Sequence, residues 1–559
     1  AHHHASKFTA RERNIALVIV ALAFVIDLLD NTIVNIAIPS IQTNLGASYS
    51  AIQWLTAGYA LAFAVLLITG GRLGDIIGYK KLFMTGVAGF TIASLLSGVA
   101  WDTNVLIIAR LVQGGMAALM VPQVMSLMQV MYPPKERGVV MGLFGALGGL
   151  AASLGPIIGG LLIQANIAGL DWRPIFLINI PVGLFAFFAA IKYLPDGKSP
   201  HPLKLDIIGT FLIIVALGLF LYPLIQGRDL DWPAWVFAMI IASLPFFAIF
   251  WWWQMKKDKK DGSPLVVPSL LGIHSFRIGL LVNIIFQMIM LGFFFTFTLV
   301  LQIGLGFSVI EAALTGIPTA VGISLSIGFL AQKLTKTLGR YTMSLGTVAM
   351  ALGLLLILWP MQAYGLSVSP WAFASGLFLT GLGMGLVMGL MFSVTLKDVD
   401  TKHAGSASGT LNAISQLGGA IGIAIVGVIF FGQLANNAPT SFTDKAEASI
   451  RTELTTEHVP SAVQDTIIAN IKTCYVDRSK QKDASETPES CKVLQSGTTT
   501  APGAEKLGSV ITDATKAAAA NNFSMAYAAT MIYAIILIVM LLGLSFTLPR
   551  KIVFEMSGH

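Results

Sequence analysis

The chain has few charged residues: Asp, Glu, Lys and Arg together make up 11% of its 559 residues, while 55% are apolar. Soluble domains average about 25% charged residues, so this composition excludes a soluble enzyme and indicates a protein with many membrane spans. The formal net charge of +7 is no sign of a nucleic-acid partner. Basic residues of membrane proteins gather in the loops on one side, and they report topology.

Cysteine is scarce, and the usual signatures of metal, nucleotide and covalent chemistry are missing from the sequence. The two cysteines, Cys474 and Cys491, lie in the single long polar segment, and no Cys or His cluster has metal-ligand spacing. The Gly-Lys-Ser string at 197–199 lacks the upstream glycine of a phosphate-binding loop. We therefore expect no metal, no cofactor and no ATP-driven pump, and we do not expect an enzyme.

Long apolar segments dominate the chain. A helix needs about 20 apolar residues to cross a bilayer, and about fourteen segments meet that criterion. Residues 1–6 resemble an expression-tag remnant and are excluded from this reasoning. The predicted spans are 14–38, 51–72, 82–100, 105–130, 138–164, 173–194, 206–226, 232–254, 276–303, 309–333, 342–363, 370–396, 407–433 and 522–548.

Lysine and arginine recur in every second connection between the predicted spans and are nearly absent from the other short connections. By the positive-inside rule, both termini are expected on the cytoplasmic side of a bacterial-type cytoplasmic membrane. The long polar segment then lies outside, where oxidising conditions favour a Cys474–Cys491 disulfide. The alternative is two free thiols in a loose loop. Residues 446–454 and 460–471 of this segment are expected to form short amphipathic helices.

Two acids lie inside the first predicted span, Asp27 near its middle and Asp30 about one helical turn further on. Ionisable side chains are costly in hydrocarbon, so they usually face a cavity or a partner. At helical spacing the two acids share one stripe with Asn31 and Asn35. We predict a proton-binding site here, with one proton shared by the pair at rest. The alternative is a polar stripe that merely pairs with Arg110 of the fourth span.

A glycine-rich string, Gly-Arg-Leu-Gly-Asp-Ile-Ile-Gly-Tyr-Lys-Lys, occupies residues 71–81 after the second span. Its glycines permit a tight turn and a close helix approach. The string resembles the signature loop of the major facilitator superfamily, with Tyr79 where that family usually has arginine. The alternative is a tight turn that has no role in gating. The residues to which the resemblance assigns gating are Gly71, Gly74, Asp75, Gly78, Lys80 and Lys81.

Two further strings resemble motifs of the same superfamily. In the fourth span, Ile-Ala-Arg-Leu-Val-Gln contains Arg110 and Gln113, and the family's arginine at this place is linked to proton transfer. Arginine keeps its proton and so needs a buried acceptor, either an acid of the first span or backbone carbonyls. In the fifth span, Gly155, Pro156 and Gly159 resemble the antiporter motif of drug exporters, which implies gating; a plain proline kink is the alternative.

Strings beginning at Leu29, Asp171 and Gly405 resemble the fourteen-span drug:proton antiporter family, and the resemblance extends over every predicted span. It implies an all-α major facilitator fold with two six-helix bundles, two additional helices between them and a binding site at their interface. The resemblance selects Asp30 as the coupling acid, whereas depth in the membrane favours Asp27. The expected organisation is an N-terminal bundle at 7–194, a linker with the inserted helices at 195–254, five C-terminal helices at 255–433, an extracytoplasmic loop at 434–521, and the last helix and tail at 522–559.

Polar amides and methionines in the predicted spans are candidates for lining a substrate cavity. Amide pairs at i, i+4 in an apolar helix either bridge to a neighbouring helix or line a cavity. Methionines suit a promiscuous apolar pocket, with ordinary helix packing as the alternative. The candidate residues are Asn31, Asn35, Gln113, Asn283, Gln287, Met384, Met388, Asn412 and Gln416.

Together these features predict a proton-coupled exporter of small lipophilic, cationic compounds that works by alternating access, as a monomer in the lipid bilayer. The proton is the expected coupling ion. One alternative is a dedicated exporter of a native lipid, siderophore or metabolite on the same fold. Another is a non-transporting membrane sensor or scaffold whose polar segment binds a partner.

Overall fold

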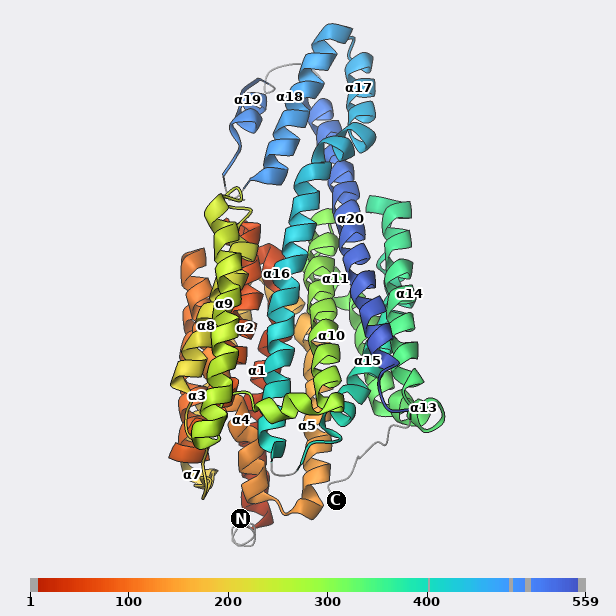
Figure 1. Cartoon of the computed structure of the whole chain (residues 1–559). Helices are drawn as coiled ribbons and strands as arrows, with labels where there is room; N and C mark the ends of the chain where they lie inside the picture. The colour runs from red at the N-terminus through yellow and green to blue at the C-terminus, as the bar shows by residue number, and fades with distance from the viewer. Residues whose placement is uncertain (1–8, 401–402, 482–485, 498–503, 551–559) are drawn as a thin grey trace.

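The computed structural model describes residues 9–400, 403–481, 486–497 and 504–550, and these residues form α-helices joined by short connections. The predicted tag remnant at 1–6 lies outside the described residues. Within the described residues, fourteen helices or groups of consecutive helices are long and apolar enough to cross a membrane. This confirms the predicted all-α membrane class and the number of spans (Figure 1).

The N-terminal half contains six spans, each close to its predicted place. The sixth is interrupted at Ile178, where α6 ends and α7 begins. Local signals explain several starts: Thr9 and Glu12 form a capping box on α1, and Ser48 caps α2. The helices are α1 (Ala10–Leu45), α2 (Tyr49–Ile77), α3 (Tyr79–Gly98), α4 (Thr103–Met131), α5 (Pro134–Ala165), η2 (Ile167–Gly169), α6 (Pro174–Leu177) and α7 (Asn179–Tyr193).

The inserted pair consists of α8 (Ile207–Gln226) and α9 (Ala234–Asp261). The predicted boundary at residue 254 falls inside α9, because a lysine-rich stretch continues the helix beyond its apolar part. The C-terminal half follows as η3 (Pro268–Gly272), α10 (His274–Leu299), η4 (Val300–Gly304), α11 (Val309–Thr315), α12 (Ile317–Leu325), η5 (Ser326–Leu330), α13 (Ala331–Leu338), α14 (Tyr341–Tyr364), η6 (Gly365–Ser367), η7 (Pro370–Phe373), α15 (Ala374–Leu396), α16 (Ala404–Lys445) and α20 (Ala504–Ser545).

Helices α16 and α20 extend far beyond their predicted spans. Each has 42 residues, which gives about 63 Å at about 1.5 Å per residue. The hydrocarbon core of a bilayer is only about 30 Å thick, so both helices project from it. The predicted loop boundaries at residues 433 and 521 therefore fall inside continuous helices. Between the two projecting ends lie α17 (Glu447–Thr456), α18 (Ser461–Lys480) and α19 (Glu489–Gly497) (Figure 1).

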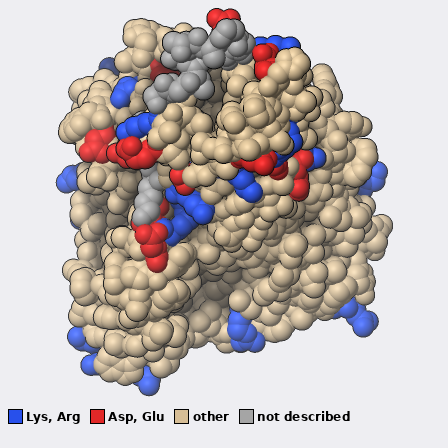
Figure 2. Space-filling model, turned by 90° about the horizontal axis from the view of Figure 1, so that it is seen from above, with Lys and Arg blue, Asp and Glu red and all other residues tan. Residues whose placement is uncertain are grey.

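We call α17, α18, α19 and the projecting ends of α16 and α20 the cap. The side of the molecule that carries the cap is the loop face, and the opposite side, where α1 begins and α20 ends, is the terminal face (Figure 1). Seen from the loop face, acidic and basic side chains gather on one part of the surface and most of the remainder is uncharged (Figure 2). The cap has its own apolar core, built from Phe442, Ala446, Ile450, Leu454, Ile468, Ile471, Ala514 and Ala518.

A disulfide joins Cys474 of α18 to Cys491 of α19, with their Cα atoms 4.8 Å apart. We expect the double variant Cys474→Ser/Cys491→Ser to expose the α18–α19 connection to protease at least ten-fold faster, because closing a loop of roughly 15 residues stabilises it by about 3 kcal/mol. Transport should be unchanged, since the core of the cap is separate from that of the spans. Limited proteolysis beside an efflux assay measures both; equal cleavage of the two proteins would contradict the prediction.

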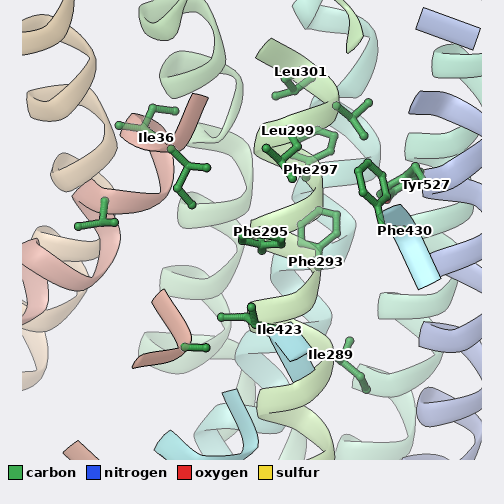
Figure 3. Close-up of a cluster of buried hydrophobic side chains, with 14 of the residues drawn as sticks. Ile36, Ile289, Phe293, Phe295, Phe297, Leu299, Leu301, Ile423, Phe430 and Tyr527 are labelled. Atoms are coloured by element: carbon green, nitrogen blue, oxygen red, sulfur yellow. The ribbon is translucent and has the colours of Figure 1, made fainter. Parts of the chain in front are cut away.

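The main apolar core runs from one half into the other. Phe293 and Phe297 of α10 stack on each other, Phe295 projects to another side of the helix, and Ile36 of α1 belongs to the same cluster (Figure 3). Phe430 of α16 packs in the same cluster on the far side of α10. Helix α10 of the C-terminal half therefore packs against the N-terminal half in the middle of the molecule.

Hydrogen bonds join the two halves in the part of the membrane region nearer the loop face. The Gln53 amide of α2 donates to the carbonyl of Ile423 in α16 at 2.9 Å. The Gln302 amide of η4 donates to the carbonyl of Ile36 in α1 at 3.0 Å. A buried amide that loses its partner costs about 1–3 kcal/mol, so these contacts favour a closed loop face.

Candidate functional site

The centre of the candidate site is an ion pair between α1 and α4. Arg110 donates through Nη1 to Asp30, and both side chains are completely buried. Gln113 lies beside them: its Oε1 accepts from Arg110 Nη1 at 3.0 Å, and its Nε2 donates to Asp30 Oδ1 at 3.4 Å. Arg110 Nε also donates to the carbonyl of Leu55 in α2 at 3.0 Å. Both predicted partners of the arginine, an acid and a backbone carbonyl, are therefore present.

Asp27 has a different environment from Asp30. Its Oδ1 accepts a hydrogen bond from the Tyr59 hydroxyl of α2, and the face of the Tyr59 ring lies 4.4 Å from the Arg110 guanidinium carbon. The predicted sharing of one proton stays a prediction, and the two carboxyl groups have separate hydrogen-bond partners. The physical reason is that α2 and α4 each provide a separate donor to α1.

Two residues of this cluster were absent from the predicted site. Tyr59 is one: its hydroxyl lies in a largely apolar part of α2, and a polar group there was the signal that could have identified it. Asn179 is the other: it donates to Ser94 Oγ at 3.0 Å and also lies against Asp30. It belongs to the string that begins at Asp171, so its motif was recognised while its role was not.

Small residues let α4 approach α2 closely enough to form the site. A Cβ added at Gly114 would lie 2.3 Å from the Tyr59 carbonyl oxygen, and one added at Gly70 would lie 2.2 Å from the Ala118 carbonyl oxygen. Real Cβ atoms do not come that close to backbone. The two helices therefore touch through their backbones, as is common where small residues face each other in membranes.

We expect Gly114→Ala to force α2 and α4 apart and to displace Tyr59 from the ion pair. Overpacking of this kind typically costs about 1–3 kcal/mol, so thermal unfolding in detergent should begin at a lower temperature and efflux should fall. Gly149→Ala is the matched control, because its Cβ would meet nothing within 4 Å. Equal melting temperatures for the two variants would show that the close approach is unimportant.

The fifth-span motif packs against the helix that carries the acids. A Cβ at Gly155 would lie 2.1 Å from Thr32 Oγ1, and one at Gly159 would lie 2.7 Å from the Ile33 side chain. Pro156 lies between them, inside the continuous helix α5. The motif therefore brings α5 close to α1 within one helical turn of Asp30. A movement of α5 at this position would displace the part of α1 that carries Asp30.

The predicted gating turn ends α2 at Gly78, whose φ of 128° favours glycine. The hydrogen-bond partner of the Asp75 side chain comes from within the turn itself. Asp75 Oδ1 accepts from the Tyr79 hydroxyl at 2.9 Å, while Lys80 donates to the carbonyl of Ile191 at 2.8 Å. Tyr79 lies one helical turn from Asp75 and reaches it first. The remaining predicted gating residues are Gly71 and Gly74, which face α4, and Lys81, which is exposed.

Arg72, which the sequence analysis did not select, lies within this turn and is buried. It donates to the carbonyls of Lys204 at 3.2 Å, Ser263 at 2.8 Å and Pro264. These carbonyls come directly before and after the inserted pair. The side chain therefore connects α2 to both ends of the inserted pair at the terminal face.

The predicted cavity residues do not form one lining. Asn283 donates to the carbonyl of Leu411 at 3.3 Å and to Ser415, so it bridges α10 to α16. Met384 is a fully buried core residue and does not fit the predicted cavity, whereas Asn412 is exposed. Periodicity places residues on a face but does not say what covers that face. The others, apart from Gln113 in the ion-pair cluster, are half-buried: Asn31, Asn35, Gln287, Met388 and Gln416.

An open groove of about 410 Å³ lies between the two halves, where α5 faces α12 and η5. Its walls are mostly apolar, with Ser153 on one side and Ser324 and Phe329 on the other. None of the predicted cavity residues lines it.

Two halves of six spans each and an inserted pair, found in the described part of the chain, with a completely buried acid–arginine pair between the first and fourth spans, define a secondary membrane transporter. The family model described as Major Facilitator Superfamily matches residues 20–423. The chain belongs to the major facilitator superfamily, and its span number and relatives agree with the fourteen-span drug:proton antiporter branch.

Several curated relatives are named for natural antibiotics. The probable actinorhodin transporter of Streptomyces coelicolor is 39% identical over 96% of this chain and 92% of its own length. The methylenomycin A resistance protein of Bacillus subtilis is 32% identical, over 74% of this chain and 86% of its own. The tetracenomycin C resistance and export protein of Streptomyces glaucescens is 30% identical over 78% of each chain.

Among solved structures, a bacterial homologue of the human lysosomal transporter Spinster, in an inward-facing and unoccupied conformation, is similar with a TM-score of 0.60. That match covers 98% of this chain and all of the other, at 15% sequence identity. At this identity the similarity shows the fold alone.

Proposed function

We propose that this transporter exports small lipophilic, cationic compounds in exchange for protons by alternating access. The observation that carries the proposal is the pair of acids on α1 with unequal partners. Asp30 is matched by the charge of Arg110, whereas Asp27 has only the neutral hydroxyl of Tyr59. A buried charge without a countercharge is costly. In this conformation, therefore, Asp27 is the acid that carries the exchangeable proton.

The exchange follows from competition for the same carboxyl groups. A substrate cation that reaches the cluster neutralises the Asp27 carboxylate as its proton leaves. After the halves rock to the other side, a proton returns to Asp27 and the cation loses its countercharge. Arg110 keeps its charge throughout and prevents Asp30 from becoming an unpaired anion. Its Nη2 has no hydrogen-bond partner among the described residues, which leaves one donor for water or a displaced carboxylate.

The sidedness and direction of transport belong to the same proposal. The basic connections lie toward the terminal face, which we therefore place in the cytoplasm, with the cap outside. The relatives named for resistance and export support outward transport. One chain contains both halves and the acid cluster, so we propose that the monomer is the working unit.

A second candidate is a dedicated exporter of one native compound. It is favoured by the 39% identical relative, whose name designates a single molecule and which matches this chain over nearly its full length. The two candidates differ in substrate breadth and share the coupling mechanism. Membership of a transporter family argues against a sensor or scaffold without transport.

An ethidium efflux assay in cells tests the proposal. Cells that express the protein should lose preloaded ethidium faster than cells without it, and a protonophore should abolish the difference. Efflux that continues at the same rate after collapse of the proton gradient would contradict proton coupling. A panel of chemically unrelated cations separates the candidates, since only the broad exporter should move several of them.

A further inference from the structure

The inserted pair α8 and α9 has no role in the exchange described above. The turn that connects the two helices on the loop face is nevertheless held by specific contacts. This connection, residues 227–233, closes through a hydrogen bond from the Trp232 amide to the Gly227 carbonyl at 2.8 Å. The Trp232 ring lies so close to Gly227 that an added Cβ would be 2.4 Å from it. The turn therefore holds a fixed shape and presents Arg228 at a fixed place.

Arg228 contacts both halves of the transporter. Its guanidinium carbon lies 5.2 Å from the centre of the Tyr49 ring and 4.7 Å from that of Phe431. The two rings stack on each other, with centroids 4.3 Å apart and planes 15° apart. Tyr49 begins α2 in the N-terminal half, and Phe431 belongs to α16 in the C-terminal half. The stacked rings and the cation thus bridge the halves at the loop face.

The neighbouring residue ties the same turn to the N-terminal half alone. Asp229 accepts a hydrogen bond from Ser48 Oγ at 3.2 Å, and its other oxygen lies 3.7 Å from Arg228. Ser48 caps α2, so the carboxylate lies near the N-terminus of that helix, where negative charge is favourable. At the terminal face, Arg72 of α2 holds both ends of the inserted pair through backbone carbonyls. The pair is therefore fastened to α2 at both faces.

We propose that the inserted pair is a clasp that moves with the N-terminal half, and that Arg228 holds the loop face closed by bridging Tyr49 to Phe431. Opening of the loop face requires α2 and α16 to separate there, which removes Arg228 from Phe431. The proposal depends on alternating access and is independent of the substrate and of the coupling ion.

The partial burial of Arg228 strengthens its cation–π contact with Phe431. Its side chain is only 26% exposed, and cation–π contacts are strongest where water is excluded. Burial lowers the pKa of Arg228 from its ordinary value, with Asp229 and Tyr49 opposing that effect. A guanidinium nevertheless keeps its proton in proteins, so the clasp acts at every physiological pH.

Distance measurements between spin labels test the clasp without any substrate. Thr43 on α1 and Asn436 on α16 are exposed near the loop face, so Thr43→Cys/Asn436→Cys provides one label on each half. The native cysteines are joined in a disulfide and take no label. We expect Arg228→Gln to raise the population with the longer distance about ten-fold over the unchanged Arg228 protein, as expected for loss of a partly buried cation–π contact. Arg228→Lys should give a smaller shift, because it keeps the charge.

Arg173→Gln is the matched control. Arg173 also stacks on an aromatic ring, that of Trp172 at 4.6 Å, but its other partners, Asn44 and Ala100, belong to the N-terminal half as well. Its loss should leave the distances unchanged. Phe431→Leu removes the ring on the C-terminal half and should reproduce the shift, which keeps the test decisive if Arg228→Gln folds poorly. The same distance distribution in the Arg228 and Phe431 variants as in their parent, or an equal shift in Arg173→Gln, would overturn the clasp.

Discussion

Replacing Asp30 with Asn is expected to reduce ethidium efflux to the level of cells that lack the transporter, while the protein still folds. The variant removes the charge that Arg110 faces and keeps the shape of the side chain. Arg110 retains its contacts with the Leu55 carbonyl, Gln113 and the Tyr59 ring, so the site loses its ion pair without collapsing. Efflux in cells, with the amount of folded protein measured in parallel, checks this result.

Asp27→Asn is the informative companion to this variant, because it leaves the Asp30–Arg110 pair untouched. We expect it to exchange substrate down a gradient and to lose the dependence on protons. Full proton-driven efflux from Asp30→Asn would contradict the account of the ion pair. Full proton-driven efflux from Asp27→Asn would instead show that Asp27 is not the exchangeable acid.

Replacing Arg110 with Gln is expected to have the largest effect on stability. The change leaves Asp30 as a buried carboxylate without a countercharge, and breaking such a pair typically costs about 3–5 kcal/mol. We expect a markedly lower melting temperature in detergent and no efflux. The matched double variant, Asp30→Asn/Arg110→Gln, replaces both charges with neutral amides and should recover most of the stability without recovering transport.

Comparing the single and double variants distinguishes a structural role of the Asp30–Arg110 ion pair from a role in transport. If the pair were only structural, the double variant would regain efflux together with stability. If Arg110→Gln alone melted at the same temperature as the unaltered protein, Asp30 would not depend on Arg110 for its charge balance. Arg173→Gln at the loop face provides a control for loss of a cation outside the site, since Arg173 contacts Trp172, Asn44 and Ala100 and no acid of the cluster.

The spans were predictable because every backbone group in a bilayer must be satisfied inside its own helix, which requires long apolar runs. The projecting ends of α16 and α20 were not predictable in this way. Their continuation is polar and alanine-rich, so hydropathy marks a boundary where the helix continues. The end of α9 was misplaced for the same reason, since its lysine-rich last turns carry no apolar signal.

The site was predictable in part. Asp27, Asp30 and Arg110 were identified because a charged side chain inside a membrane span is costly and usually serves a function. Which acid faces Arg110 was not predictable, because it depends on how α2 and α4 pack against α1. Met384 was misassigned because a methionine on a helix face looks the same in the sequence whether it lines a cavity or fills a core.

Transport by the purified protein in vesicles with an acidic lumen tests the central claim most directly. Protons that leave through an antiporter should drive ethidium into the vesicles above its outside concentration, with no other energy source. The account predicts this accumulation for the unaltered protein, its collapse with a protonophore, and only equilibration with Asp27→Asn. Accumulation that is the same with and without the pH gradient, or that persists in Asp27→Asn, would contradict the claim that this buried acid couples export to protons.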